Sequence, residues 1–230
     1  MNIREMHELF RLLGQQMGME RIRVILPQSI DGYIDNAIDD TISLILKDNL
    51  QYVSRRQIVL TNFTSPINAL STLYKEQVIN VNTNEKKGDI TVSAEINDVL
   101  YLYAFSLKYK DDERFFNCRI IEPDRLELTF NDFCNRASYR YPIINIPFTG
   151  KVEKDYTFEL YTDRNAIINS LKVKYLKVPN KVHFDEDNFG KENDTSVDCD
   201  LPVHLHHRIV ELAVQKYFES VGSTTHSNKQ

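Results

Sequence analysis

The stretch from Leu201 to Val221 limits what this chain can fold into, because it has the pattern of one amphipathic helix with a broad apolar face. Pro202 suits a first helical position, and Gly222 suits the C-terminal cap. One apolar row, with residues four apart, comprises Leu205, Ile209, Ala213 and Tyr217. Such a face is stable only when other elements cover it. The sequence therefore predicts a helical bundle in which these four residues pack against helices from elsewhere in the chain.

The first part of the chain supplies candidate partner helices. Residues 2–17 predict a helix in which Asn2 and Glu5 form a capping pair. A second helix is predicted from Pro27 to about Leu46, and a short third helix over residues 65–75. These segments predict an N-terminal group of helices that packs on the last helix.

The middle of the chain changes from helical periodicity to alternation of apolar and polar residues. Predicted strands occupy residues 77–82, 90–96, 99–109, 114–121, 141–148, 152–161 and 171–178. The first two strands flank residues 84–88, which predict a hairpin turn. Residues 130–139 fit either a helix or a loop. Because consecutive strands have short connections without helices between them, we expect an α+β protein with an antiparallel β-sandwich or barrel inserted into a helical bundle.

The long third strand is rich in aromatic residues. Tyr101, Tyr103, Phe105, Leu107 and Tyr109 are expected to share one side of it. Such a strand could stack nucleic-acid bases. Its aromatics are interleaved with Leu and Ala rather than with Lys and Arg, which favours core packing.

These patterns divide the chain into five segments. They are N-terminal bundle helices at 1–76, a β insertion at 77–182, an acidic loop at 183–200, the last bundle helix at 201–222 and a flexible tail at 223–230. The charge follows this division: residues 185–200 hold seven acids and one base, a net charge of −6 within a chain total of −5, so the rest of the chain has a net charge of about +1. A strongly basic nucleic-acid-binding surface is therefore not expected.

Composition narrows the class of protein further. Hydrophobic residues at 42% and charged residues at 27% are typical of a globular protein. The three cysteines are Cys118, Cys134 and Cys199, and their odd number and wide spacing argue against a disulfide framework or a structural zinc site. Neither a signal peptide nor a membrane-spanning segment is recognisable. We expect a soluble protein made in a cytosol, without membrane attachment.

Three aspartates, Asp31, Asp35 and Asp39, recur at spacing four on the second helix and so share one face. They could hold Mg²⁺ for phosphodiester chemistry. However, no further acid or histidine stands beside them at a motif spacing, so a solvated or interface face is the favoured interpretation. We expect them to line a subunit contact or a channel.

Two other groups of residues contain side chains that can bind metal ions. Of His204, His206 and His207, only His204 and His207 have a spacing that places two ligands on one helix face, which favours packing or solvent exposure over metal binding. The acidic loop matches an EF-hand at three positions, but Phe189 and Ser196 stand where ligands are required. No nucleotide-binding or nucleophile motif is present, and neither a cofactor, a metal nor an enzymatic activity is predicted.

Three stretches of the sequence carry a resemblance to a known family. VKYLKVPNKV (173–182) followed, after a polar spacer, by DLPVHLHHRIVELAVQKYFES (200–220) resembles the C-terminal signature of head-to-tail connector, or adaptor, proteins of tailed bacteriophages. The segment SIDGYIDNAIDDTISLIL (29–46) is similar to an early helix of that family. The whole organisation, β insertion included, is most similar to the ring proteins of crAss-like phages.

This resemblance implies a structural virion protein without enzymatic activity. It implies a homo-oligomeric ring, expected to be twelve-fold, that contacts the portal protein and other connector or tail proteins. The ring would be assembled in the host bacterial cytoplasm and would continue the channel for genomic DNA without binding a specific DNA sequence. Two alternatives from the residues alone remain open: a monomeric β-sandwich module that binds nucleic acid or glycan, and a metal-dependent phosphodiesterase.

Overall fold

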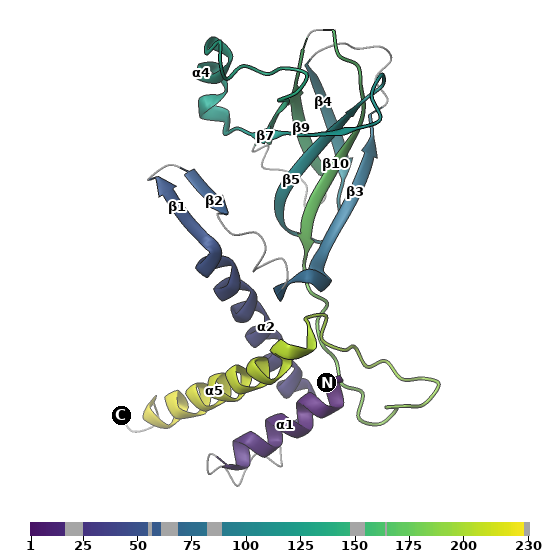
Figure 1. Cartoon of the computed structure of the whole chain (residues 1–230). Coiled ribbons are helices and arrows are strands. Elements are labelled where there is room, and N and C mark those ends of the chain that lie inside the picture. The colour runs from purple at the N-terminus through teal and green to yellow at the C-terminus, as the bar shows by residue number, and fades with distance from the viewer. Residues whose placement is uncertain are drawn as a thin grey trace. The chain divides into compact units, whose positions relative to one another are not determined.

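The chain forms two compact units of different secondary structure (Figure 1). The computed structural model describes residues 1–16, 25–54, 57–60, 69–81, 89–147, 155–163 and 165–227. The helical unit comprises Met1–Leu73 and Pro179–Gln230, and the β unit comprises Tyr74–Val178. The predicted α+β class is confirmed. The β unit occupies 74–178, where the sequence placed a β insertion at 77–182.

Three helices form the core of the helical unit. They are α1 (Ile3–Gln16), α2 (Pro27–Asn49) and α5 (Val203–Ser227), and each contacts the other two. Their fully buried apolar residues include Ile3, Met6, Phe10, Ile30, Ile34, Ala37, Ile209, Val210 and Ala213. The Tyr217 ring lies 5.4 Å from that of Tyr33 and 6.0 Å from that of Phe10. Residues from both ends of the chain therefore share one core. Ile209, Ala213 and Tyr217 pack in it as the sequence predicted, and the fourth predicted residue, Leu205, is half-buried.

The ends of the helices test the capping predictions. The Glu5 N–H donates to Asn2 Oδ1 at 2.8 Å and the Asn2 N–H donates to Glu5 Oε2 at 3.1 Å, so the predicted capping pair is confirmed. The predicted end of the last helix at Gly222 is wrong, because α5 continues to Ser227. A glycine inside a helix costs only about 1 kcal/mol, which the neighbouring residues can offset. Residues 223–227 are thus helical rather than a flexible tail, and 228–230 lie outside the described residues.

The region between the helices and the β unit differs from the prediction. A two-stranded antiparallel hairpin, β1 (Leu50–Ser54) with β2 (Gln57–Leu60), follows α2, where no strand was predicted. Residues 65–68 of the predicted helix at 65–75 lie outside the described residues. Within the rest, a short 3-10 turn, η2 (Ser71–Leu73), leads directly into the first strand of the β unit, so residues 74 and 75 are in a strand and not in the predicted helix.

The β unit contains two four-stranded sheets. The first has the order β3 (Tyr74–Asn80), β10 (Ile168–Lys177), β5 (Val99–Tyr109) and β6 (Phe115–Asn117). The second has the order β4 (Ile90–Glu95), β9 (Asp155–Tyr161), β8 (Ile143–Asn145) and β7 (Arg119–Ile120). All neighbouring strands are antiparallel except β7 and β8, which are parallel. Between β7 and β8 lie η3 (Pro123–Arg125) and α4 (Leu126–Asn131). The helix α4 ends at the start of residues 130–139, the segment for which the sequence fitted either a helix or a loop.

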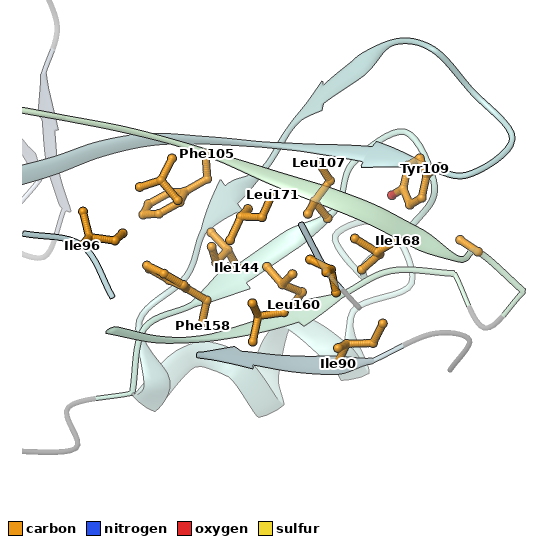
Figure 2. Close-up of a cluster of buried hydrophobic side chains, with 14 residues drawn as sticks. Ile90, Ile96, Phe105, Leu107, Tyr109, Ile144, Phe158, Leu160, Ile168 and Leu171 are labelled. Carbon is orange, nitrogen blue, oxygen red and sulfur yellow. The ribbon is translucent and has the colours of Figure 1, made fainter. Parts of the chain in front are cut away.

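The two sheets share one hydrophobic core (Figure 2). Phe105 and Leu171 from the first sheet pack with Ile144, Phe158 and Leu160 from the second sheet. The Phe105 and Phe158 rings lie 5.5 Å apart. Apolar side chains of both sheets thus meet in a single core.

Two sequence-based expectations about the sheets are wrong. The segments before and after residues 84–88 do not pair as a hairpin, because β3 pairs with β10 and β4 pairs with β9 in the other sheet. In β5, the register against β10 shifts near Lys174, which interrupts the strict alternation of sides. As a result Leu102, rather than Tyr101 or Tyr103, packs against the core.

Candidate functional site

The aspartate row of α2 is the best-defined polar feature of the helical unit, and it serves mainly contacts within the chain. Asp31 is only 6% exposed. Its Oδ1 lies 2.7 Å from Nε2 of His7, and its Oδ2 accepts a 3.2 Å hydrogen bond from the Phe184 N–H. Nδ1 of His183 lies 3.3 Å from the same Oδ2. Asp31 is thus buried and bonded within the chain, whereas the sequence predicted a channel or subunit contact for it.

Asp35, one turn further along α2, also contacts the segment that follows the β unit. Its Oδ1 accepts a 2.9 Å hydrogen bond from the Val182 N–H. Burial raises the pKa of Asp35 above its ordinary value, while the bond from Val182 acts in the opposite direction. Asp31 and Asp35 thus hold two alternate N–H groups of one extended segment against α2. This use of both carboxylates was invisible to helical periodicity, because their partners lie about 150 residues away in the sequence.

The end of the row is more exposed. Asp39 is exposed, which is compatible with the predicted contact or channel role. Its neighbour Asp40 forms an ion pair with Lys216 of α5 at 2.6 Å. Of the three predicted aspartates, Asp31 is buried, Asp35 is half-buried and Asp39 is exposed, so Asp39 is the best placed for contacts outside the chain.

A cavity of about 350 Å³ lies beside the buried His7–Asp31 pair. It is bordered by Arg4, His7, Glu8 and Arg11 from α1, and by Phe184, Glu186 and Phe189 from the loop. The Phe184 ring lies 4.8 Å from the His7 ring and 5.5 Å from the Phe189 ring. At the rim, Arg4 pairs with Glu8 at 2.9 Å and Arg11 with Glu186 at 3.8 Å. The charges at this cavity are therefore balanced, and its walls are aromatic.

The acidic loop is folded by its own carboxylates. Asp185 accepts hydrogen bonds from Asn188 and Thr195, which lower its pKa. Asp194 accepts the N–H groups of Gly190 and Ser196, and its pKa is lowered for the same reason. The loop is thus a folded Ω-like segment, held by hydrogen bonds among its own residues.

The three histidines of the last helix have different environments. His206 is buried, with Nδ1 3.0 Å from the Met1 carbonyl oxygen and Nε2 2.7 Å from that of Leu201. His207 is exposed and lies 3.3 Å from Glu211. His204 is exposed as well. His206 therefore packs the start of α5 against the chain's first residue, which agrees with the favoured packing role.

The aromatic strand does not present a stacking surface. Tyr109 is buried, its hydroxyl is hydrogen-bonded to Thr162 at 2.8 Å, and burial raises its pKa to about 12. Phe105 is also buried. Tyr103 is half-buried and its ring contacts that of Tyr74 at 5.4 Å. The core-packing interpretation is confirmed for Phe105, Leu107 and Tyr109.

The described residues form no metal site, and the sequence has no recognisable relatives among known families and curated proteins. Among the residues that the structure describes, no three His, Cys, Asp or Glu side chains come together in a way that could hold a metal ion. Within the same residues, every helix is too short or too polar to cross a membrane. Compared with known protein families and with characterised proteins, the sequence matches no family model and no individual protein.

Sequence reasoning missed His7 and His183. His7 lies in an amphipathic helix where a histidine has no distinctive signal, and His183 stands at the start of a polar loop. Only the fold brings both to Asp31. The sequence does contain one weak indication that Asp31 is buried. Asp31 follows Ile30 and lies three residues before Ile34, so it stands at the edge of the apolar face of α2.

Proposed function

We propose that this protein is a structural component of a tailed-phage virion and forms a ring between the portal and the tail that continues the DNA channel. The sequence resemblance and the packing of α2 against α5 support this role. The segments that resemble connector proteins, 29–46 and 200–220, form α2 and most of α5, and these two helices pack against each other in one unit. The β unit is an insertion between them.

The distribution of charge supports a role around DNA without tight binding. The β unit holds 16 Lys and Arg and 16 Asp and Glu, so its net charge is zero. The helical unit holds the remaining 12 basic and 17 acidic residues, a net charge of −5. Lys and Arg that contact phosphates hold DNA by releasing counterions. Residues 185–200 alone contribute −6, so the rest of the helical unit has a net charge of about +1. Neither unit thus has the large excess of Lys and Arg that would hold DNA, which supports a channel that lets the genome pass.

Exposed apolar side chains on both units support assembly with other subunits. On the β unit, Leu128 is 72% and Phe133 is 79% exposed, and Tyr141 is exposed beside them in sequence. On the helical unit, Leu26 and Val203 are exposed. Exposed apolar groups that gather on one segment are typical of interaction surfaces.

The two alternatives find less support. A nucleic-acid or glycan module would need the aromatic strand at the surface, whereas Phe105 and Tyr109 are buried. A phosphodiesterase would need Asp31, Asp35 and Asp39 to converge on one metal ion. Asp31 and Asp35 are instead engaged by His7 and by main-chain N–H groups.

Electron microscopy of virions tests the proposal. We expect density for this chain in a cyclic ring at the portal vertex, with twelve copies. Purified full-length protein mixed with portal protein should form a larger complex in mass photometry. Virions in which the chain is absent from the portal vertex would refute the connector role.

The channel role has a separate test at Asp39. An Asp39→Lys substitution should leave folding intact because the side chain is exposed. If Asp39 lines the channel, the variant particles should assemble in normal numbers and eject DNA more slowly, because the added Lys contacts phosphate. If Asp39 lies at a subunit contact, ring assembly should fail. The matched control is Asp187→Lys in the acidic loop, which we place at the periphery and expect to behave as the wild type. Normal assembly and normal ejection by Asp39→Lys virions would contradict both roles.

A further inference from the structure

The turn after α4 carries the most exposed large apolar side chain among the described residues. Phe133 is 79% exposed, and Leu128 in α4 itself is 72% exposed. The helix α4 stands to one side of the two sheets of the β unit (Figure 1). Large apolar groups that gather at the surface of a soluble protein usually mark an interaction site. The Phe133 ring is therefore a candidate for insertion into a partner.

Hydrogen bonds fix the conformation of this turn. Oδ1 of Asp132 accepts the Cys134 N–H at 2.9 Å, and Oδ2 of Asp132 accepts Nδ2 of Asn135 at 2.6 Å. The guanidinium of Arg119, on β7, donates to the Asn135 carbonyl oxygen and ties the turn to the sheet. A side chain held in place before binding loses little conformational freedom on binding, and phenylalanine is enriched at the centres of protein interfaces.

The cavity beside α1 has the size and the walls to receive a phenylalanine ring. Its volume is about 350 Å³. An apolar cavity of about 150 Å³ is already large enough to bind benzene. Phe184 and Phe189 border the cavity, and their ring centres lie 5.5 Å apart. A third ring can pack against them in the edge or offset arrangements that aromatic pairs favour.

Charge favours a second copy of this chain as the partner. Residues 132–141 contain Arg136, Arg140 and one acid, Asp132, so the turn has a net charge of +1. The loop 185–200, which contributes Phe189 to the cavity, has a net charge of −6. Opposite charges on two surfaces speed their encounter and select the correct partner.

The symmetry of a ring favours the same partner. Neighbours in a closed ring make head-to-tail contacts, so each copy needs two different surfaces that match each other. This chain has an aromatic side chain that projects from its β unit and an aromatic cavity in its helical unit.

We propose that the Phe133 ring of each copy inserts into the cavity between α1 and the acidic loop of a second copy, where it packs against Phe184 and Phe189. The contact joins the β unit of one copy to the helical unit of the next. The inference rests on the proposed ring function for its closure, since the contact repeats in one direction around the ring.

Disulfide trapping on the full-length protein tests the contact. The native Cys134 is exposed and follows Phe133, and Glu8→Cys places a second thiol at the exposed rim of the cavity. Mild oxidation should link these two positions between copies and give dimers, trimers and longer chains on a non-reducing gel. Peptide mass spectrometry identifies the linked positions. The matched control, Gln215→Cys on the exposed face of α5, should link at least tenfold more slowly.

Substitutions in the Glu8→Cys protein test the role of the aromatic ring. Phe133→Ala should slow the linking about tenfold, because the ring contributes most of the apolar area buried in the contact. Leu128→Ala removes another exposed apolar side chain of the same segment and should leave the rate unchanged. An equal loss in both variants would indicate general apolar adhesion and would overturn the proposal.

Mixing two variants tests the direction of the contact. Phe189→Ala removes one wall of the cavity and should slow the linking as Phe133→Ala does. A mixture of the two variants should again form linked dimers but nothing longer, because one copy keeps Phe133 and only the other keeps the cavity. This rescue also shows that both variants are folded. Failure of the mixture to form dimers would overturn the proposal.

Oxidation of virions that carry Glu8→Cys separates this contact from the ring function. Linked chains in the virion support both proposals. A ring of this chain at the portal vertex without a link from Cys134 to position 8 would overturn the contact and leave the ring function standing. Linked chains of the purified protein, together with virions that lack this chain at the portal vertex, would refute the ring function alone. The absence of links in both preparations would overturn the contact.

Discussion

The Ile3 N–H donates a 2.7 Å hydrogen bond to Oδ1 of Asp198, which joins two residues 195 positions apart in the chain. The first N–H groups of a helix have no partner within the helix, and a carboxylate near them also interacts favourably with the helix dipole. Asp198 therefore completes the N-terminal cap of α1. The acidic loop is in this way a structural part of the helical unit.

Replacing Asp198 with Ala should lower the free energy of unfolding by about 1 kcal/mol, because one N–H group of α1 loses its partner. Urea denaturation monitored by circular dichroism measures the change. Glu192→Ala removes an exposed acid of the same loop and should have no measurable effect. Equal free energies of unfolding for the Asp198 variant and the wild type would show that this hydrogen bond does not stabilise α1.

Asp31→Asn should destabilise the protein by about 1–3 kcal/mol, which is typical when a buried hydrogen-bonded group loses a partner. The amide can accept at only one atom, whereas Asp31 accepts from both His7 and Phe184. Urea denaturation at pH 7 gives the magnitude. Asp39→Asn, on the same helix and exposed, is the control and should leave stability unchanged. A wild-type unfolding midpoint for Asp31→Asn would count against a structural role for the pair.

Asp35→Asn should be at least as stable as the wild type at pH 7. Burial raises the pKa of Asp35 in the folded protein above its ordinary value of 3.8, so its charge reduces stability above the folded pKa. The reduction disappears as the pH falls through the folded pKa toward the unfolded one. Asn keeps an acceptor for the Val182 N–H and is neutral at every pH. The advantage of the variant should therefore be present at pH 7 and lost below about pH 4, as measured by urea unfolding across this range. A variant less stable than the wild type at pH 7 would contradict the assignment.

Gly32→Ala should stabilise the protein by about 0.5–1 kcal/mol. Gly32 lies on the exposed face within α2, and an added Cβ would meet no atom within 4 Å. Alanine lowers the entropy of the unfolded chain and fits the helical conformation. Thermal unfolding of the isolated protein gives the sign. A lower melting temperature would show that α2 is distorted at this residue.

Ala213→Asp should yield an insoluble or unfolded protein, because Ala213 is fully buried and an unpaired charge there costs several kcal/mol. Soluble expression and the amide NMR spectrum report the outcome. Gln215→Asp introduces the same side chain on the exposed face of α5 and should be tolerated. A folded Ala213→Asp variant with the wild-type melting temperature would refute the bundle packing.

Local patterns predicted the helices well. The capping pair at Asn2 and Glu5 and the packing of Ile209 and Ala213 depend on residues within a few turns, which periodicity reports directly. The end of α5 was missed for the opposite reason, because a cap signal such as Gly222 competes with the propensity of the residues on both sides.

Pairing between strands could not be derived in the same way. The sequence shows that residues 74–80 and 90–95 alternate, but both patterns fit either sheet. Their separation into different sheets depends on β10, which comes some ninety residues after β3 and takes the place beside it. Non-local contacts of this kind leave no periodic trace.

The polar site shows the same limit. Asp31, Asp35 and Asp39 were correctly placed on one helix, yet a row of acids on a helix usually faces solvent. Burial of Asp31 depends on His7, 24 residues earlier, and on the Phe184 N–H, 153 residues later. The spacing of residues within α2 cannot reveal either partner.

The β unit begins and ends in neighbouring strands, since Tyr74 of β3 pairs with Leu176 of β10. Directly paired residues of antiparallel strands have Cα atoms about 4.5–5.5 Å apart, so the chain leaves this unit next to where it enters. A gene with this layout can gain, lose or exchange the whole segment between residues 74 and 178 by recombination, with only a short loop needed to rejoin the helices. The contacts made by the inserted unit can therefore diverge between lineages while the helices that frame it stay the same.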